Sequence, residues 1–370
     1  MNIGIDVRPL ASGPYTGVAN VVRHLLPPLF ALADNERFVL FFVSGRGIPR
    51  DVALWQKQFS HVIIRARHIP GRLFDAATRF FPRALPDYAK KCDVLLSPNI
   101  NIVTTNTPRV LVVHDLSFAR YPEFLSPLQR YWHWLMNPKE QARGAGTIIV
   151  PSFATKEDVV KLWDIDAEKI HIVPWGGPEF RDQGSGIRDQ GNPYILSLGA
   201  AEPRKNFVTL VRAFEIMKNV NARLIIAGPS AYGIGEIRRA ISSSFAKDRI
   251  ELRGFVSEEE KEKLLLDAAV FVYPSLLEGF GLPVLEAMAA GVPVVASNRS
   301  SLPEVMGEAG ILVDPYKPEE IAQAVDAVLA DQELAAELSR RGKERAQQFT
   351  WEKTAETVLE ILRTAAKDSV

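Results

Sequence analysis

Cysteine is almost absent from this chain of 370 residues, which holds only Cys92. A single cysteine excludes an internal disulfide framework and favours a reducing compartment, so we expect a cytoplasmic protein. The first residues, MNIGIDVRPL, have the pattern of a strand and lack the basic and apolar regions of a signal peptide. Long apolar runs are missing as well. The longest, such as FVLFFV at 38–43, have the length of a strand and are too short to span a bilayer.

Net charge is also lacking, because 44 basic side chains balance 44 acidic ones. A neutral chain gives no reason to expect nucleic acid as a partner. Residues 37–109 are nevertheless basic, with 12 Lys and Arg against 4 Asp and Glu, and include the aromatic stretch GRLFDAATRFFPRALPDYAKK. This region could face anionic lipid headgroups or a phosphorylated acceptor, which would place the protein peripherally at the inner face of a membrane. It could equally be a solvated basic helix whose aromatic stripe faces the core.

Metal-ligand clusters of His and Cys are missing, as are Walker and Gly-x-Ser-x-Gly motifs. The nearest approach to a metal motif is Asp-Ile-Asp at 164–166, which lies in a polar connection where we expect a surface turn. The sequence therefore predicts no bound metal and no resident cofactor.

What the chain does have is a regular alternation of short apolar runs and amphipathic stretches on both sides of a polar segment. That segment, RDQGSGIRDQGN at 181–192, has no apolar periodicity and is expected to be a linker. The alternation predicts an α/β protein with two doubly wound parallel-sheet, Rossmann-like domains, at 1–180 and 193–349, facing across a ligand cleft. A last helix at 350–370 begins at the expected cap Thr350 and could pack back on the N-terminal domain.

Two glutamates stand out in the apolar stretch YPSLLEGFGLPVLEAMAAGVPVVAS at 273–297. Glu278 and Glu286 have seven residues between them. On one continuous helix that spacing would leave the two carboxylates on different faces. Something must therefore interrupt the segment between them, although either glutamate alone could be an ordinary solvated charge.

The interruption is a Gly-x-Gly loop followed by Pro283, a residue preferred at the first position of a helix. We therefore expect a buried strand at 268–275, a loop, a helix at 283–290 and a further strand. Glu278 then follows the carboxyl end of a strand, and Glu286 lies near the start of the helix. Open α/β sheets bind ligands at this edge, and the N–H groups of a helix start suit a phosphate.

Taken together, the motifs resemble glycosyltransferase family 4, the retaining group with the GT-B fold, nearly end to end. EGFGLPVLEAMAAGVPVVAS is similar to the E-x7-E signature, and YILSLGAAEPRKNFVTLVRAF to the strand-loop-helix that holds the donor diphosphate. RGFVSEEEKEKLL resembles the loop that reads the nucleobase, VVHDLSFARYPE the His-Asp loop, and SGPYTGVANVV the N-terminal glycine loop beside the donor phosphates.

The resemblance implies a role for each matched residue. Glu278 would lie near the donor sugar hydroxyls and Glu286 on the nucleotide ribose. Arg204 and Lys205 would hold the diphosphate, and His114 would lie beside the transferred sugar. The remaining donor-binding positions that it implies are Gly17, Gly199, Phe255, Val256, Gly279, Phe280, Gly281 and Leu282.

The chemistry agrees with these roles, because negative charge builds on the diphosphate as the sugar departs, and fixed cations with backbone N–H donors stabilise it. Many relatives carry arginine directly after the strand's glycine, where this chain has Ala200, so Arg204 is the candidate for that duty. The resemblance implies front-face attack without a metal, in which the departing phosphate oxygen helps to deprotonate the acceptor.

We therefore expect a retaining transferase that moves a hexose from a nucleotide sugar to a saccharide or lipid-linked acceptor. EPRKN and HDLSFARYPE look most like the mannosyltransferase branch, which makes GDP-mannose the first donor and leaves UDP-sugars open. A sugar-nucleotide epimerase or hydrolase of similar fold, or a non-catalytic nucleotide-sugar-binding protein, are the alternatives.

Overall fold

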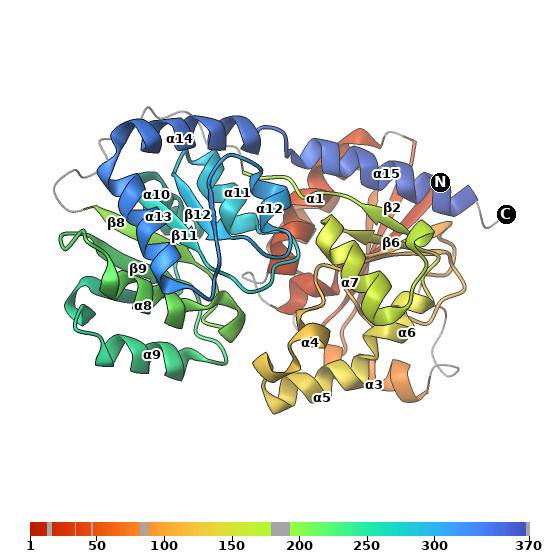
Figure 1. Cartoon of the computed structure of the whole chain (residues 1–370). Coiled ribbons are helices and arrows are strands. Elements are labelled where there is room, and N and C mark those ends of the chain that lie inside the picture. The colour runs from red at the N-terminus through yellow and green to blue at the C-terminus, as the bar shows by residue number, and fades with distance from the viewer. Residues whose placement is uncertain are drawn as a thin grey trace. The chain divides into compact units, whose positions relative to one another are not determined.

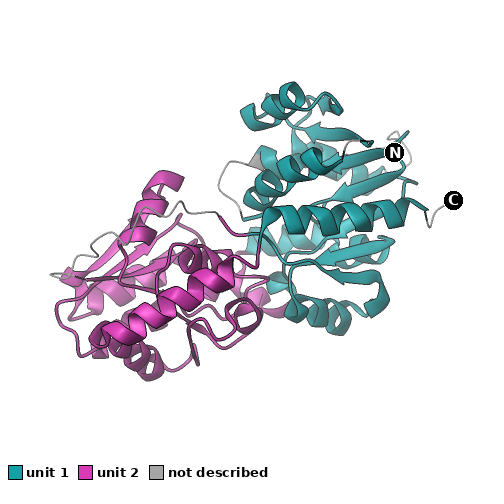
Figure 2. Ribbon diagram, turned by 90° about the horizontal axis from the view of Figure 1, so that it is seen from above, with its two compact units in different colours: residues 1–119, 127–176, 350–370 teal, residues 120–126, 177–349 magenta. Residues whose placement is uncertain are grey.

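The computed structural model describes residues 1–12, 17–33, 35–45, 47–81, 87, 89–178 and 193–367. The predicted linker at 181–192 lies outside the described residues. The chain divides into two compact units, shown in different colours in Figure 2. Unit 1 comprises Met1–Ala119, Pro127–Gly176 and Thr350–Val370, and unit 2 comprises Arg120–Ser126 and Gly177–Phe349.

Unit 1 is built on a seven-stranded parallel sheet with the order β3-β2-β1-β4-β5-β6-β7 (Figure 1). The order reverses between β1 and β4, which is where a doubly wound sheet forms its ligand crevice. The strands are β1 (Asn2–Asp6), β2 (Arg37–Val43), β3 (Val62–Arg67), β4 (Val94–Ser97), β5 (Arg109–Val112), β6 (Thr147–Val150) and β7 (Ile170–Ile172).

The helices of this part of the chain are α1 (Gly17–Leu32), α2 (Arg50–Gln58), α3 (Gly71–Phe80), α4 (Ser117–Arg120), α5 (Pro127–Met136), α6 (Pro138–Arg143), α7 (Phe153–Trp163) and α15 (Trp351–Lys367). The last helix packs on α1, β4 and β5. Its Trp351 ring stacks on His24 at a centroid distance of 5.5 Å, and Arg363 pairs with Glu36 at 2.8 Å. As expected, the Thr350 hydroxyl oxygen caps the helix by accepting from the Lys353 N–H.

Unit 2 contains a six-stranded parallel sheet with the order β10-β9-β8-β11-β12-β13. Its strands are β8 (Tyr194–Leu198), β9 (Arg223–Ala227), β10 (Ile250–Gly254), β11 (Val270–Tyr273), β12 (Val294–Ser297) and β13 (Ile311–Val313). Every residue of β8, β11 and β12 is buried, because helices cover both faces of a doubly wound sheet. The order reverses between β8 and β11.

The helices of unit 2 are α8 (Phe207–Ile216), α9 (Ile234–Ser243), α10 (Glu258–Asp267), α11 (Leu282–Ala289), α12 (Leu302–Met306), α13 (Pro318–Ala330) and α14 (Gln332–Ala346). A capping box formed by Ser257 and Glu260 starts α10. α8 and α13 pack against each other, and a continuous apolar core joins them to the sheet.

The two units differ from the predicted domains of 1–180 and 193–349 in two places, because unit 2 begins at Gly177 and because it also includes residues 120–126, which precede more of unit 1 in sequence. Tyr121 accounts for part of this, since its hydroxyl forms a hydrogen bond with that of Tyr316. The predicted surface turn at 164–166 is present: Asp164 ends α7 in a left-handed conformation, and Asp166 caps the 3₁₀ turn that follows. In the part of the chain that the structure describes, every helix is too short or too polar to cross a membrane.

Candidate donor site

The candidate site lies at the carboxyl ends of β8 and β11, the two strands that flank the reversal of strand order in unit 2. Gly199 follows β8 directly, and Glu278 comes five residues after the end of β11. All strands of the sheet are parallel, so these loops emerge at one edge. This is the edge at which open α/β sheets bind ligands.

Glu278 is the centre of a buried hydrogen-bond cluster. Its Oε1 accepts from Lys205 Nζ at 2.6 Å, from Ser275 Oγ at 2.6 Å and from Tyr273 Oη at 3.1 Å. Its Oε2 lies 3.0 Å from Nη1 of Arg204. Lys205 Nζ also donates to the hydroxyl of Tyr273. The structure therefore brings together the glutamate and both cations that the sequence pattern assigns to the donor.

The cluster stabilises the negative charge of Glu278 but disfavours the positive charge of Lys205. Burial alone would raise the pKa of Glu278, but Arg204 and Lys205 outweigh it and hold the pKa at about 2. For Lys205, burial and the adjacent Arg204 cation lower the pKa in spite of the Glu278 carboxylate. Both directions follow from one arrangement, in which two cations share one buried carboxylate. A second anion between the cations would relieve their repulsion.

Arg204 and Lys205 are positioned by a short 3₁₀ turn, Pro203–Lys205, which ends at Asn206. Asn206 has a left-handed backbone (φ 58°), a conformation that suits glycine or asparagine. Its side-chain amide donates to the carbonyls of Pro274 and Pro315, which ties the loop to the ends of two other strands. Glu202 Oε2 accepts from Nε of Arg204 at 2.7 Å, so this arginine pairs with two carboxylates, those of Glu202 and Glu278.

The second glutamate of the pattern, Glu286, lies on α11 and pairs with Lys261 of α10 at 2.9 Å. α11 begins after Gly281, whose φ of 106° is available to few residues other than glycine. Its start supplies backbone N–H groups of the kind that bind phosphate. Leu282 is the first residue of the helix, and Gly279 lies in the loop before it.

Phe280, between the two loop glycines, is buried and packs edge-on against Phe349 at a centroid distance of 5.7 Å. A donor-binding role for this residue would therefore fall to its backbone. Its carbonyl accepts a hydrogen bond from the hydroxyl of Ser301, which fixes the loop.

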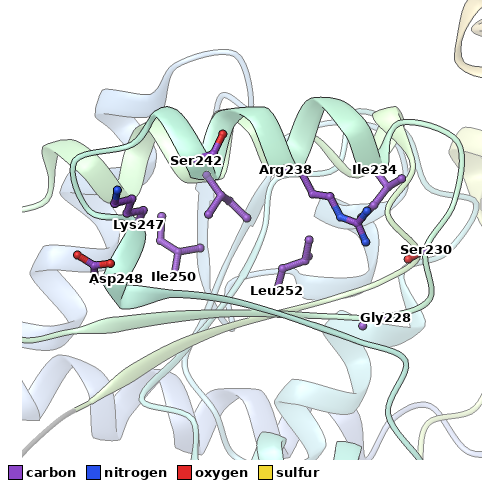
Figure 3. A pocket seen from close by; sticks show the side chains of 11 residues that line it. Gly228, Ser230, Ile234, Arg238, Ser242, Lys247, Asp248, Ile250 and Leu252 are labelled. Carbon is purple, nitrogen blue, oxygen red and sulfur yellow. The ribbon is translucent and has the colours of Figure 1, made fainter.

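A pocket of about 500 Å³ adjoins the loop predicted to read the nucleobase. It lies between α9, β10 and the loop that follows β9, and Figure 3 shows Arg238 and Ile234 of α9 on one side with Leu252 of β10 on the other. At one end the pocket is lined by Gly228 and by Gly254, which immediately precedes Phe255 and Val256. The Phe255 side chain is 47% exposed.

Two predicted residues belong to unit 1. His114 follows β5, and its Nε2 lies 2.7 Å from the carbonyl oxygen of Pro98, after β4. Burial lowers the pKa of His114, which favours the neutral imidazole. Gly17 is the first residue of α1, and a Cβ at that position would meet no atom within 4 Å.

Sequence reasoning missed three residues of this arrangement: Tyr273 and Ser275, which bind Glu278, and Lys261, which binds Glu286. Tyr273 and Ser275 stand inside an apolar run that predicts a buried strand and so drew no attention. Lys261 stands in the charged run SEEEKEK, where one lysine cannot be told from the next. The described residues contain no group of three or more His, Cys, Asp and Glu side chains suited to a metal ion.

Comparison with known proteins agrees with this geometry. Residues 15–176 match the family model described as Glycosyltransferase Family 4, and residues 180–345 match the one described as Glycosyl transferases group 1. The chain is 30% identical over 303 residues to O-antigen chain mannosyltransferase B of Escherichia coli, a match that covers 77% of this chain and 79% of that relative. The chain belongs to glycosyltransferase family 4. It is accordingly a glycosyltransferase enzyme, as its motifs predict.

A longer relative is the serotype-specific mannosyltransferase WbdA of Escherichia coli. It is 28% identical over 284 residues, which are 71% of this chain and 34% of WbdA, so this family 4 chain spans about a third of that relative. Among solved structures, HepE of Anabaena, in complex with UDP and glucose, matches 98% of this chain and 100% of its own with a TM-score of 0.74 and 18% identity. That likeness confirms the predicted GT-B fold.

Proposed function

We propose that this family 4 enzyme transfers mannose from GDP-mannose to a saccharide or lipid-linked acceptor, with retention of the anomeric configuration and without a metal. The observation that carries the proposal is the pairing of Lys205 and Arg204 around Glu278 at the ligand-binding edge of unit 2. The choice of mannose is supported by the names of two relatives, O-antigen chain mannosyltransferase B and WbdA.

In this proposal the donor diphosphate binds beside Lys205 and Arg204, the backbone of Gly199 and the start of α11. In the structure Glu278 pairs with both cations. A bound diphosphate would compete with this carboxylate for them. Once the phosphate takes over the cations, the carboxylate keeps Tyr273 and Ser275 as donors and can accept from a sugar hydroxyl. Negative charge then grows on the leaving diphosphate next to cations already in position.

The outer parts of the donor would be held by the remaining predicted residues. Glu286 would bind the ribose, and the backbone at Phe255 and Val256 would read the base. His114 of unit 1 would lie beside the transferred sugar as a neutral hydrogen-bonding group. The protein would act in the cytoplasm and contact the inner face of the membrane peripherally through the basic region 37–109.

A UDP-sugar is the second candidate donor, because the structure of HepE holds UDP and glucose. The experiment that separates the two is a panel of GDP- and UDP-linked sugars, incubated with the enzyme in excess chelator, with and without a lipid extract as the acceptor source. We expect acceptor-dependent release of GDP from GDP-mannose, and a product whose NMR spectrum shows the anomeric configuration of the donor. Turnover of UDP-glucose alone, an inverted product or a need for Mn²⁺ would contradict the proposal.

A further inference from the structure

Arg238 of α9 is a cation that lines the pocket beside the loop predicted to read the nucleobase. Its side chain is exposed and, among the described residues, makes no hydrogen bond, ion pair or ring contact. Two other arginines near β10 are already bound. Arg249 donates to the Ala222 carbonyl at 2.9 Å, and Arg253 pairs with Glu251 at 2.6 Å. Arg238 is therefore available to a ligand of the pocket.

The guanidinium of Arg238 points toward one end of the pocket. In Figure 3 it lies on the side of Ser230 and Gly228, whereas Lys247 and Asp248 line the opposite end. Gly228 comes directly after β9. The charged end of the side chain therefore lies toward the carboxyl end of that strand, which is the edge of the sheet where the candidate donor site is found.

That end of the pocket adjoins the backbone of the donor site. Gly228 donates from its N–H to the Gly254 carbonyl at 2.7 Å, which joins the ends of β9 and β10. A Cβ on Gly228 would lie 1.9 Å from the carbonyl oxygen of Gly199, so these two backbones are in close contact. Gly199 in turn lies against Lys205, whose Cε would be 3.2 Å from a Cβ there. The pocket end and the diphosphate cation thus follow one another along the ends of β10, β9 and β8.

The surfaces at this end suit a flat ring with hydrogen-bond acceptors on one edge. Ile234 and Leu252 present apolar side chains from opposite sides of the pocket in Figure 3. A guanidinium donates two parallel hydrogen bonds, and guanine presents two acceptors, O6 and N7, on a single edge. The corresponding edge of a uracil ring presents one acceptor, O4. Arg238 therefore matches guanine better than uracil.

We infer that Arg238 selects guanine by donating hydrogen bonds to its O6 and N7. The inference deepens the proposed use of GDP-mannose and rests on it. The backbone of Phe255 and Val256, proposed to read the base, carries N–H and C=O groups that do not depend on the side chain. Arg238 adds a preference for one base. Because it lies away from the reacting atoms, its loss should weaken donor binding and leave turnover at saturating donor unchanged.

The test is calorimetric binding of GDP, 7-deaza-GDP and UDP to the full-length enzyme and to Arg238→Met. 7-Deaza-GDP keeps O6 but carries C–H in place of N7. We expect Arg238→Met to weaken GDP binding about tenfold or more, to weaken 7-deaza-GDP binding less, and to leave UDP binding nearly unchanged. Arg239→Met is the matched control, because Arg239 is the next residue of α9, is exposed and lies outside the pocket lining. It should bind all three nucleotides as the wild type does.

The outcomes separate this inference from the proposed donor. A wild type that prefers GDP, with the same preference in folded Arg238→Met, would overturn the inference and leave GDP-mannose as the donor. Equal losses of GDP and UDP binding would also overturn it, because Arg238 would then hold the diphosphate. So would equal binding of GDP and 7-deaza-GDP by the wild type. A wild type that prefers UDP would contradict both the inference and the proposed donor.

Discussion

At the residue scale, the account depends on how Glu278 is held. Its two carboxylate oxygens already meet a lysine, an arginine, a serine and a tyrosine, and the side chain is buried. A carboxylate bound in this way stays ionised and is a poor general base. In the proposed mechanism it would keep Lys205 and Arg204 charged and in place until a diphosphate binds.

Tyr273 supports that arrangement, because its hydroxyl accepts from Lys205 and donates to Glu278. Replacing it with phenylalanine removes only the hydroxyl, and we expect turnover to fall about tenfold with a smaller change in donor affinity. Tyr194→Phe is the matched control, since it also removes a buried hydroxyl of unit 2, one that donates to the Leu264 carbonyl. Steady-state kinetics and calorimetric GDP binding test this, and equal losses in both variants would argue against a positioning role for Tyr273.

Stability in acid offers a second residue-scale prediction. Folding lowers the pKa of Glu278 from its ordinary value of 4.5 to about 2, although burial opposes the change. A lowered carboxyl pKa stabilises the fold above pH 4.5, and that stability is lost as the pH falls toward 2. The difference corresponds to on the order of 3 kcal/mol. We therefore expect the free energy of urea unfolding, followed by circular dichroism, to fall between pH 4.5 and 2. The fall should be larger by about that amount in the wild type than in Glu278→Gln. Parallel profiles would show that the carboxylate is not stabilised in this way.

The sequence could point to Glu278 and Glu286 because their spacing places them at a strand end and a helix start, and the family resemblance pointed to Arg204 and Lys205. It could not show that Lys205 reaches Glu278, since 73 residues separate them. Nor could it distinguish a tyrosine that packs from one that also binds a carboxylate. That distinction depends on where the loop after β11 turns.

At the element scale, the start of α11 depends on Gly281. Its φ is 106°, and a Cβ there would lie 2.6 Å from Cδ2 of Leu302. We expect Gly281→Ala to destabilise unit 2 by about 1–3 kcal/mol and to weaken GDP binding, because the loop before the helix must move. Gly235→Ala, at the start of α9, has open space and no positive φ, so it should be neutral or slightly stabilising. Urea unfolding and calorimetry compare the two, and an unperturbed Gly281→Ala would remove the geometric argument for this loop.

Most elements were predictable because apolar strands and amphipathic helices alternate. Two stretches, 126–144 and 317–348, each have the amphipathic pattern of one long helix, and the structure divides both. The stretch 126–144 divides into α5 and α6 at Asn137, which has a positive φ and precedes Pro138. The stretch 317–348 divides at Asp331, whose extended backbone and side chain cap α14. The three-residue strands β7 and β13 escaped prediction because they are too short to show a period.

At the scale of the whole molecule, the tryptophans allow the two units to be followed separately. All six lie in residues of unit 1. Saturating GDP should therefore raise the unfolding midpoint seen by circular dichroism, which reports both units together, more than the midpoint seen by tryptophan fluorescence, which reports unit 1. At a hundredfold excess over the dissociation constant the expected gain is about 2.7 kcal/mol. A shift confined to the tryptophan signal would place the nucleotide on unit 1 instead.

The whole-molecule account rests on one electrostatic claim, that a buried cation of unit 2 stabilises the departing diphosphate. Lys205→Ala tests it most directly, with GDP-mannose as donor and Lys263→Ala, at an exposed position of α10, as control. We predict a loss of turnover of about a hundredfold, on the order of 3 kcal/mol, with a much smaller loss of GDP affinity and an unchanged fold, because the charge on the diphosphate is greatest in the transition state. Near-normal turnover by folded Lys205→Ala would contradict the account.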